Sequence, residues 1–224
     1  MFAPMTGGNG TPQVRFEVIG QAWDLYRGQL GTWAVNSLML VLAVTAVSVV
    51  IDRVASLFGA SVFWAPPRMA LNVLNSALAY TLLGMMLHIA VRHVRGYTPS
   101  LDRLSDLLPK MGKLFIASLV MGAINTVAFA LCILPGVVTS GLLMFTLPLV
   151  VDRDAEPIEA AQRSFDILKA QWLTAALFHF VVSLLGAVGI IACGVGIVFT
   201  MPLYLLSVAL QYVQFIQARG DVVE

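Results

Sequence analysis

The stretch that decides the fold is Pro148-Leu-Val-Val-Asp-Arg-Asp-Ala-Glu-Pro-Ile-Glu-Ala-Ala-Gln-Arg-Ser-Phe-Asp-Ile-Leu-Lys-Ala-Gln-Trp172. It collects eight charged side chains between two long uncharged runs. A charge at the centre of a lipid bilayer costs roughly 2.5–3.5 kcal/mol, so charged stretches mark where a chain leaves the membrane. We interpret this stretch as a cytoplasmic connector between two transmembrane hairpins.

The composition also indicates an integral membrane protein. Hydrophobic residues make up 59% of the sequence and charged residues 11%, whereas a soluble domain has about 25% charged residues. The formal net charge of +1 offers no basic excess to a nucleic acid. Residues 1–13 are small, polar and glycine-rich, which predicts a disordered tail rather than a cleaved signal peptide. We expect one transmembrane domain over residues 14–218 and a cytoplasmic tail over residues 219–224.

The uncharged runs predict six transmembrane helices. Such a helix needs about 20 apolar residues, and two of the runs are about twice that length. Pro135-Gly136 and the segment from Cys193 to Gly196 supply turns where these two runs fold back. The predicted spans are residues 30–51, 69–91, 114–134, 137–151, 171–192 and 197–217. Pro148 and Pro202 fall within or near two of them, as structural kinks or as hinges for transport.

The positions of the basic residues predict the orientation. Of the 13 Lys and Arg residues, only Arg53 and Arg68 fall on one side of the predicted membrane, and the others fall on the opposite side. Basic residues concentrate on the cytoplasmic side of membrane proteins. We therefore expect both termini in the cytoplasm and a multi-pass protein of the bacterial inner membrane.

Each pair of spans is preceded by a segment with a helical apolar stripe. In the connector the stripe is Ile158, Ala161, Phe165, Leu168 and Trp172, and charged residues lie elsewhere around the helix, namely Glu159, Arg163, Asp166 and Lys169. The other two stripes are Val14, Val18, Ala22 and Leu25, and Leu101, Leu104, Leu108 and Met111. Such amphipathic helices lie along a membrane surface or across the inner mouth of a bundle.

These segments resemble one another in sequence. Trp23-Asp24-Leu25-Tyr26-Arg27-Gly28-Gln29 matches Phe165-Asp166-Ile167-Leu168-Lys169-Ala170-Gln171 in residue type, and Ser105-Asp106-Leu107-Leu108-Pro109-Lys110 is a looser third copy. We therefore predict an all-α, polytopic membrane helical bundle. Its six transmembrane helices form three parallel hairpin repeats, each preceded by a cytoplasmic amphipathic helix.

Part of the chain resembles a known family. The residues that carry the likeness are Leu134-Pro135-Gly136, Leu147-Pro148-Leu149-Val150, Asp152, Ala160-Ala161, Ser164, Gly194 to Gly196, Pro202 and Tyr212. They resemble the bacterial six-helix membrane proteins grouped with the membrane domain of glycerophosphoryl diester phosphodiesterases. The likeness implies a fold and a location. The catalytic domain of those enzymes is a separate soluble segment with a metal-binding motif that these residues lack, so the activity does not carry over.

Polar residues at membrane depth are the remaining candidate site. Asn36, Asn72, Asn75 and Asn125 act either as hydrogen bonds between helices or as a polar translocation path. His179 has the same two interpretations, as an interhelical contact or as a proton-relay or ligand-binding residue. Cys132 and Cys193 fall at equivalent outer ends of two predicted spans, where a disulfide is conceivable.

No residue pattern predicts catalysis, a metal site or a cofactor. The three histidines fall on different elements without a metal-ligand spacing, and no nucleophile is paired with a base. We expect a non-enzymatic scaffold, assembly factor or accessory subunit that acts through its cytoplasmic amphipathic helices. Its partners would be membrane lipids, a membrane protein or further copies of itself. The alternative is a small permease-like carrier of a lipid or small amphiphile.

Overall fold

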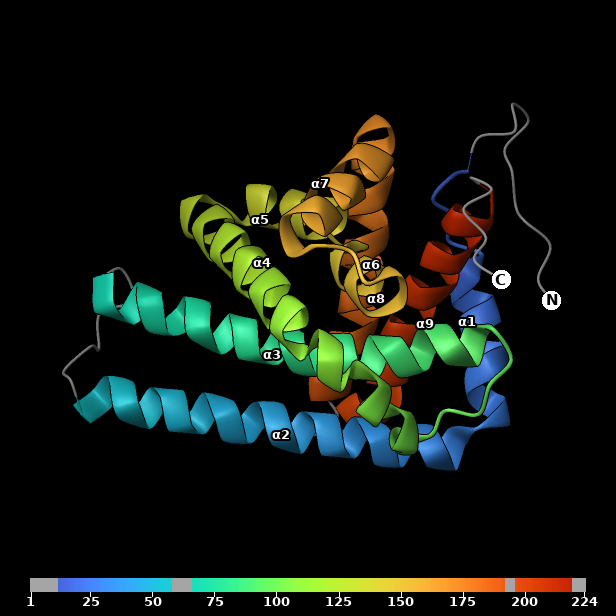
Figure 1. Ribbon diagram of the computed structural model, residues 1–224, viewed down its shortest axis with the longest axis horizontal. Coiled ribbons are helices and arrows are strands. Elements are labelled where there is room, and N and C mark those ends of the chain that lie inside the picture. The colour runs from blue at the N-terminus through green and yellow to red at the C-terminus, as the bar shows by residue number, and fades with distance from the viewer. Residues whose placement is uncertain (1–11, 58–65, 192–195, 219–224) are drawn as a thin grey trace.

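The computed structural model describes residues 12–57, 66–191 and 196–218, and the regular elements in these ranges are all helices (Figure 1). They are α1 (Val18–Gly28), α2 (Leu30–Leu57), α3 (Pro66–Val94), η1 (Leu101–Lys110), α4 (Met111–Leu131), α5 (Ile133–Leu142), α6 (Thr146–Arg153), α7 (Pro157–Leu168), η2 (Lys169–Gln171), α8 (Trp172–Ile191) and α9 (Gly196–Ala218), where η marks a 3-10 helix. The chain is all-α, as predicted.

Six helical stretches are long and apolar enough to cross a membrane. They are Leu30–Leu57, Pro66–Val94, Leu101–Leu131, Ile133–Arg153, Pro157–Gly189 and Gly196–Ala218. Each contains one of the predicted spans almost entirely. The third and fifth begin earlier than predicted, because η1 runs directly into α4 and α7 continues through η2 into α8. These six stretches make the chain a multi-pass membrane protein.

The turn between the third and fourth spans differs from the prediction. The chain reverses at Cys132, whose extended backbone (φ −170°, ψ 156°) separates α4 from α5, and not at Pro135-Gly136. Pro135 is the third residue of α5. Backbone N–H groups in the first turn of a helix have no partner within that helix, so a proline there removes no hydrogen bond.

The fourth span is not one helix. α5 ends at Leu142, and α6 starts at Thr146 after a three-residue turn. Ser164 of α7 fills the break, because its hydroxyl donates to the Leu142 carbonyl at 2.7 Å and accepts from the Phe145 N–H at 3.1 Å. Pro148 lies in the first turn of α6, again without loss of a helical hydrogen bond. Pro202 lies inside α9.

The predicted stripe of α7 packs into the bundle at some positions and faces outward at others. Ala161 and Leu168 are buried, whereas Ile158, Phe165 and Trp172 are 62%, 46% and 50% exposed. The buried face consists of Pro157, Ala160, Ala161, Ser164, Ile167 and Leu168. Small residues let helix backbones approach closely inside a membrane, whereas large apolar side chains can face lipid instead.

The stripe of the middle segment is shifted by one residue. Leu107, which the predicted stripe omits, is buried, and Leu108, which it includes, is 71% exposed. The cause is the 3-10 geometry of η1, in which three residues complete a turn. Residues three apart then lie on one face, so Leu101, Leu104 and Leu107 line up in place of Leu108.

Helix α1 and the residues before it pack as the first stripe predicts. Val14, Val18 and Ala22 are buried against the core, and Leu25 is half-buried beside it. The side chain of Gln171 donates to the Pro12 carbonyl at 2.8 Å, and Gln211 donates to the Gln13 carbonyl at 3.2 Å. These bonds hold residues 12 and 13 against the bundle, and residues 1–11 of the predicted tail lie outside the described residues.

The core centres on α6 and the second half of α9. Every residue from 205 to 216 of α9 and from 146 to 151 of α6 is buried. α9 contacts α1, α2, α3 and α8, and Phe145 packs edge-on against Tyr212 and Phe215 with ring centres 5.8 and 5.4 Å apart. Figure 1 shows α2 and α3 as an antiparallel pair, with α4 crossing α3. This arrangement leaves a cavity where the spans meet.

Candidate functional site: a central cavity

A cavity of about 480 Å³ lies between the helices, and each of the six spans contributes to its lining. One representative from each span is, in chain order, Leu40, Leu83, Met121, Ser140, His179 and Met201. Cavities that hold small molecules are commonly about 300–1,000 Å³ and mostly apolar, with a few placed polar groups. The volume and the lining therefore suit a small ligand rather than bulk water.

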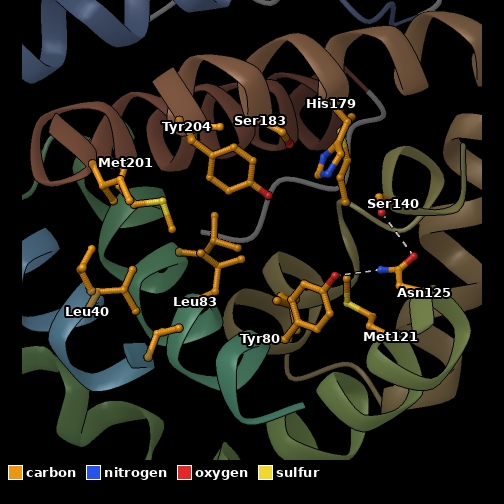
Figure 2. A pocket seen from close by; sticks show the side chains of 18 of the residues that line it. Leu40, Tyr80, Leu83, Met121, Asn125, Ser140, His179, Ser183, Met201 and Tyr204 are labelled. Carbon is orange, nitrogen blue, oxygen red and sulfur yellow. Dashed lines mark hydrogen bonds between the residues drawn. The ribbon is translucent and has the colours of Figure 1, made fainter. Parts of the chain in front are cut away.

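The cavity has an apolar end and a polar end (Figure 2). Leu40 and Met201 lie at one end in this view, whereas Asn125, Ser140 and His179 lie at the other. The hydroxyls of Tyr80 and Tyr204 lie toward the polar end. Within the described part of the chain, none of the lining residues is Asp, Glu, Lys or Arg.

Asn125 of α4 organises the polar end. Its amide nitrogen donates to the Tyr80 hydroxyl at 3.0 Å, and its carbonyl oxygen accepts from the hydroxyls of Thr139 at 2.9 Å and Ser140 at 3.3 Å. These bonds join α4 to α3 and to α5. The single Thr139 proton is shared between this oxygen and the Gly136 carbonyl, which lies 3.0 Å from the Thr139 hydroxyl.

His179 of α8 has no hydrogen bond from its Nδ1 atom, although that atom is buried. The imidazole packs edge-on against the Tyr204 ring of α9, with ring centres 5.9 Å apart. A buried polar atom without a partner costs roughly 1–3 kcal/mol. The protein therefore holds an unsatisfied polar group at the wall of its cavity.

The wall has a gap at Gly186 of α8. A Cβ atom built there would meet only the Cβ of Tyr204, at 3.8 Å, which is an ordinary van der Waals distance. The Gly186 carbonyl accepts a hydrogen bond from the Thr200 hydroxyl at 2.8 Å, which ties α8 to α9. A Cβ atom at this lining position is therefore tolerated, and a larger side chain would reduce the space beside Tyr204.

The other predicted polar residues lie away from the cavity. Asn36 donates to the Pro99 carbonyl at 3.1 Å, and Asn75 accepts from the Ser48 hydroxyl at 3.2 Å, so both join neighbouring segments. The Asn72 amide nitrogen is buried without a partner. Of the residues predicted at membrane depth, the structure therefore brings only Asn125 and His179 together at one site.

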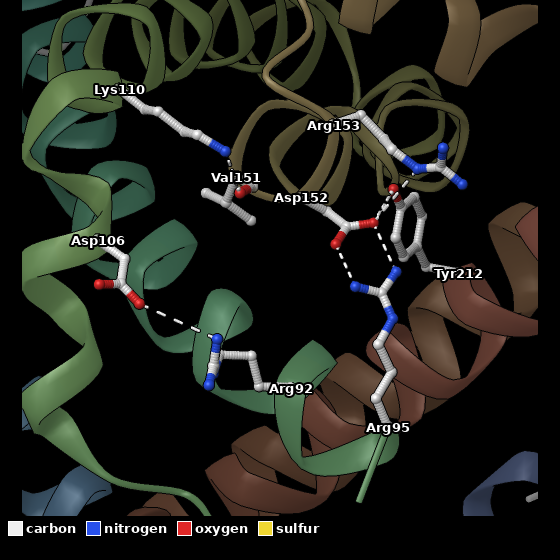
Figure 3. A network of polar contacts seen from close by, with 8 residues as sticks. All are labelled: Arg92, Arg95, Asp106, Lys110, Val151, Asp152, Arg153 and Tyr212. Atoms are coloured by element: carbon white, nitrogen blue, oxygen red, sulfur yellow. Dashed lines mark hydrogen bonds and ion pairs between the residues drawn. The ribbon is translucent and has the colours of Figure 1, made fainter. Parts of the chain in front are cut away.

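A polar network lies at the end of the bundle where α3, α6 and α9 meet (Figure 3). Arg95 donates to both carboxylate oxygens of Asp152, at 2.5 and 2.8 Å, and Tyr212 donates to Asp152 at 2.9 Å. The hydrogen bonds to Asp152 raise the pKa of the Arg95 guanidinium above its ordinary value. Lys110 donates to the Val151 carbonyl at 3.2 Å, and Arg92 lies 4.0 Å from Asp106. These contacts fix the helix ends to one another.

The charged residues of α7 and η2 form a separate exposed surface. Glu159, Arg163, Asp166 and Lys169 are all exposed, and Lys169 pairs with Asp166 at 2.6 Å. Beside them, an open groove between α7 and the helices α4 and α5 is lined by Ile158 and Phe165. The surface is thus accessible, as an interaction face must be.

The described residues contain no group of three or more His, Cys, Asp and Glu side chains that could hold a metal ion. Cys132 is exposed and unpaired, and Cys193 lies outside the described residues. Comparisons of the chain with protein-family models, curated proteins and solved structures found no match. The likeness to the phosphodiesterase-associated membrane proteins therefore stays a prediction.

Several cavity residues were not predicted from the sequence. Tyr80, Tyr204, Ser140 and Ser183 line the cavity, yet none stands out in an apolar span. One signal was present, since Tyr80 and Asn125 fall on adjacent spans, as do His179 and Tyr204. That signal becomes meaningful only when the packing of the helices is known.

Proposed function

We propose that this chain is a non-enzymatic membrane protein that takes a small amphiphile from the bilayer into its central cavity, as a binding protein or small carrier. The observation that carries the proposal is the cavity itself, which all six spans line and whose wall is apolar apart from one polar end. An amphiphile has the same division into an apolar and a polar part. We therefore favour a carrier over the scaffold that we expected from the sequence.

The polar groups that line the cavity are suited to binding. Ser183 and His179 are the lining residues best suited to act as a nucleophile and a base, and no hydrogen bond joins them. Asn125 and Ser140 are engaged with each other. Binding needs only the hydrogen bonds and the apolar wall.

We further propose that the six spans are three parallel repeats. Asp24 pairs with Arg27, as Asp166 pairs with Lys169, at the same spacing in the sequence. Trp23 and Phe165 are 47% and 46% exposed, whereas Tyr26 and Leu168 are buried. Equivalent residues thus have equivalent surroundings in two copies. In the third copy Asp106 approaches Arg92 instead.

The basic residues support the proposed orientation, with both termini in the cytoplasm of a bacterium and the chain in its inner membrane. Arg92, Arg95, Lys110 and Lys113 meet acidic or carbonyl groups near the ends of α3, α4 and α6. Arg68 pairs with Asp52 between the other ends of α2 and α3. The basic residues therefore lie at two separate sets of helix ends. The positive-inside rule assigns the set with more basic residues to the cytoplasm.

A second candidate function is that of a scaffold or accessory subunit that docks a membrane-protein partner or another copy of itself. The observation that favours it is the exposed surface of α7 and η2, which presents Glu159, Arg163, Asp166 and Lys169. The two functions are compatible, since this surface and the cavity involve different residues.

The carrier proposal is tested by filling the cavity. Gly186→Leu places a side chain in the cavity, and Gly112→Leu is the matched control, because Gly112 is exposed on α4 with nothing within 4 Å of an added Cβ. Both changes raise helix propensity by about 1 kcal/mol. Each protein is purified in mild detergent, and its bound lipids are identified by mass spectrometry. We expect a bound species in the wild type and in Gly112→Leu that is lost in Gly186→Leu. Equal lipid content in the three proteins would refute the proposal.

A further inference from the structure

The residues at the polar end of the cavity favour a ligand without a charge. No Asp, Glu, Lys or Arg lies among the lining residues that the structure describes, so an ionic headgroup would find no partner of opposite charge. A lone charge buried in an apolar site costs far more than a neutral polar group. An uncharged headgroup is therefore favoured over a phosphate, a carboxylate or an ammonium group.

The hydrogen-bonding capacity left at this end specifies the headgroup's chemistry. The Tyr80 oxygen accepts a hydrogen bond from Asn125, so the Tyr80 proton remains available to donate to a ligand oxygen. The imidazole of His179 also lines the cavity, and its ring nitrogens can donate or accept according to the tautomer. A hydroxyl or a carbonyl group offers what both residues need.

The hydrogen bonds of Asn125 support this assignment. Ser140 donates to its oxygen, the Thr139 hydroxyl lies 2.9 Å from the same oxygen, and its nitrogen donates to Tyr80. The Tyr204 ring likewise holds the imidazole of His179 from the side. Two hydrogen-bonding groups are thus held in place from α3 and α8 before any ligand enters, which reduces the entropy cost of binding.

The opposite end of the cavity accounts for the rest of the ligand. Leu40, Val44 and Met201 offer only carbon and sulfur surface there, which suits a hydrocarbon chain. A wholly apolar ligand could fill this end, but it would leave His179 unsatisfied. A molecule with a hydrocarbon chain and a polar headgroup matches both ends of the cavity.

We propose that the cavity binds an uncharged, single-chain amphiphile whose hydroxyl or carbonyl headgroup is hydrogen-bonded by Tyr80 and His179, an inference that rests on the proposed binding function. A monoacylglycerol or a fatty alcohol has this chemistry. The headgroup lies at the Asn125 end, and the chain extends toward Leu40 and Met201.

The test is equilibrium binding of two radiolabelled probes that share one acyl chain, to the full-length protein in phospholipid nanodiscs free of detergent. Monooleoylglycerol is uncharged, and oleoyl lysophosphatidylglycerol is anionic. We expect the wild type to bind the uncharged probe at least tenfold more tightly. His179→Leu and Tyr80→Phe should each weaken its binding about 3- to 10-fold, the effect of one lost hydrogen bond. A hydrocarbon of the same chain length should bind both variants as it binds the wild type, which shows that the cavity is intact.

The outcomes separate this inference from the proposed function. If the anionic probe binds as tightly as the uncharged one, and Gly186→Leu abolishes both, the cavity binds amphiphiles but the neutral-headgroup inference is overturned. The same inference is overturned if neither His179→Leu nor Tyr80→Phe changes the affinity for monooleoylglycerol. If Gly186→Leu changes the binding of neither probe, the proposed function itself fails, and the inference fails with it.

Discussion

The hydroxyl of Ser164 donates a 2.7 Å hydrogen bond to the carbonyl of Leu142, across the point where the fourth span breaks. The same oxygen accepts from the Phe145 N–H. In a membrane no water is available to bond such groups, so a break is tolerated only where protein groups replace the missing partners. Ser140, Met144 and Leu147 around the break all line the cavity. Ser164 therefore supports one wall of the proposed binding site from a different helix.

Replacing this serine should destabilise the protein. Ser164→Ala leaves two buried backbone groups without partners, and we expect a loss of about 1–3 kcal/mol in unfolding free energy. Gln162→Ala, at an exposed position of the same helix, is the control and should change stability little. Denaturant unfolding in detergent measures both. Equal stability of Ser164→Ala and the wild type would show that the break needs no support from α7.

The Arg95–Asp152 pair predicts a second effect on stability. Only 9% of the Asp152 side chain is exposed, and Arg95 and Tyr212 both donate to it. Asp152→Asn removes the charge from this site, and we expect a loss of about 1–3 kcal/mol. Asp166→Asn is the control, because the Asp166–Lys169 pair is exposed and such pairs contribute little. A smaller loss for Asp152→Asn than for Asp166→Asn would contradict the structural role of this network.

Charge reversal on α7 tests the second candidate function. Arg163 and Lys169 are exposed, so changing both to Glu should leave insertion and folding intact. If a partner docks on this surface, the double variant should lose the partner in co-purification. Basic side chains near anionic lipid each contribute about 1 kcal/mol of attraction, which is a competing explanation for any loss.

The opposite reversal separates the two explanations. Changing Glu159 and Asp166 to Lys should strengthen lipid attraction while it spoils a specific docking surface. Loss of the partner in both double variants supports docking, and loss in the first alone supports lipid attraction. Normal behaviour of both variants would rule out a function for this surface.

The orientation is tested by chemical labelling in intact cells. Cysteines placed at Gly7 and at Asp221, in a chain whose two native cysteines are replaced by alanine, should react with a membrane-impermeant thiol reagent only after the cells are opened. Reaction of either cysteine in intact cells would reverse the assignment of the termini. The expectation rests on the distribution of basic residues and on the positive-inside rule.

The spans were predictable from the sequence, because the cost of a buried charge restricts where helices can cross a membrane. The break at Leu142 was not, since the residues that follow, Leu143, Met144 and Phe145, are apolar and carry no turn signal. The backbone groups freed at the break are satisfied by a side chain from a distant part of the sequence, Ser164. The sequence also did not show which residues of the α7 stripe face the bundle, because apolarity marks a buried face in water but not in lipid.

The candidate site was predictable only in part. Asn125 and His179 stood out because amides and imidazoles are uncommon in apolar spans. Tyr80 and Tyr204 did not, because tyrosine is frequent near membrane interfaces and the sequence does not show which span neighbours which. The cavity itself arises from six helices meeting around residues that are far apart in the chain.

The most direct test of the central claim is photo-crosslinking of a bilayer-derived chain to the cavity wall. Cells that produce the protein are fed a photoreactive fatty acid, irradiated, and the labelled peptides are mapped by mass spectrometry. Label is expected at Leu42, Val127 and Leu184, which are exposed on the outside of the bundle. The account predicts additional label at Leu83, Met121 and Met201 inside the cavity, which Gly186→Leu removes and Gly112→Leu retains. Label confined to the outer residues, or cavity label that persists in Gly186→Leu, would contradict it.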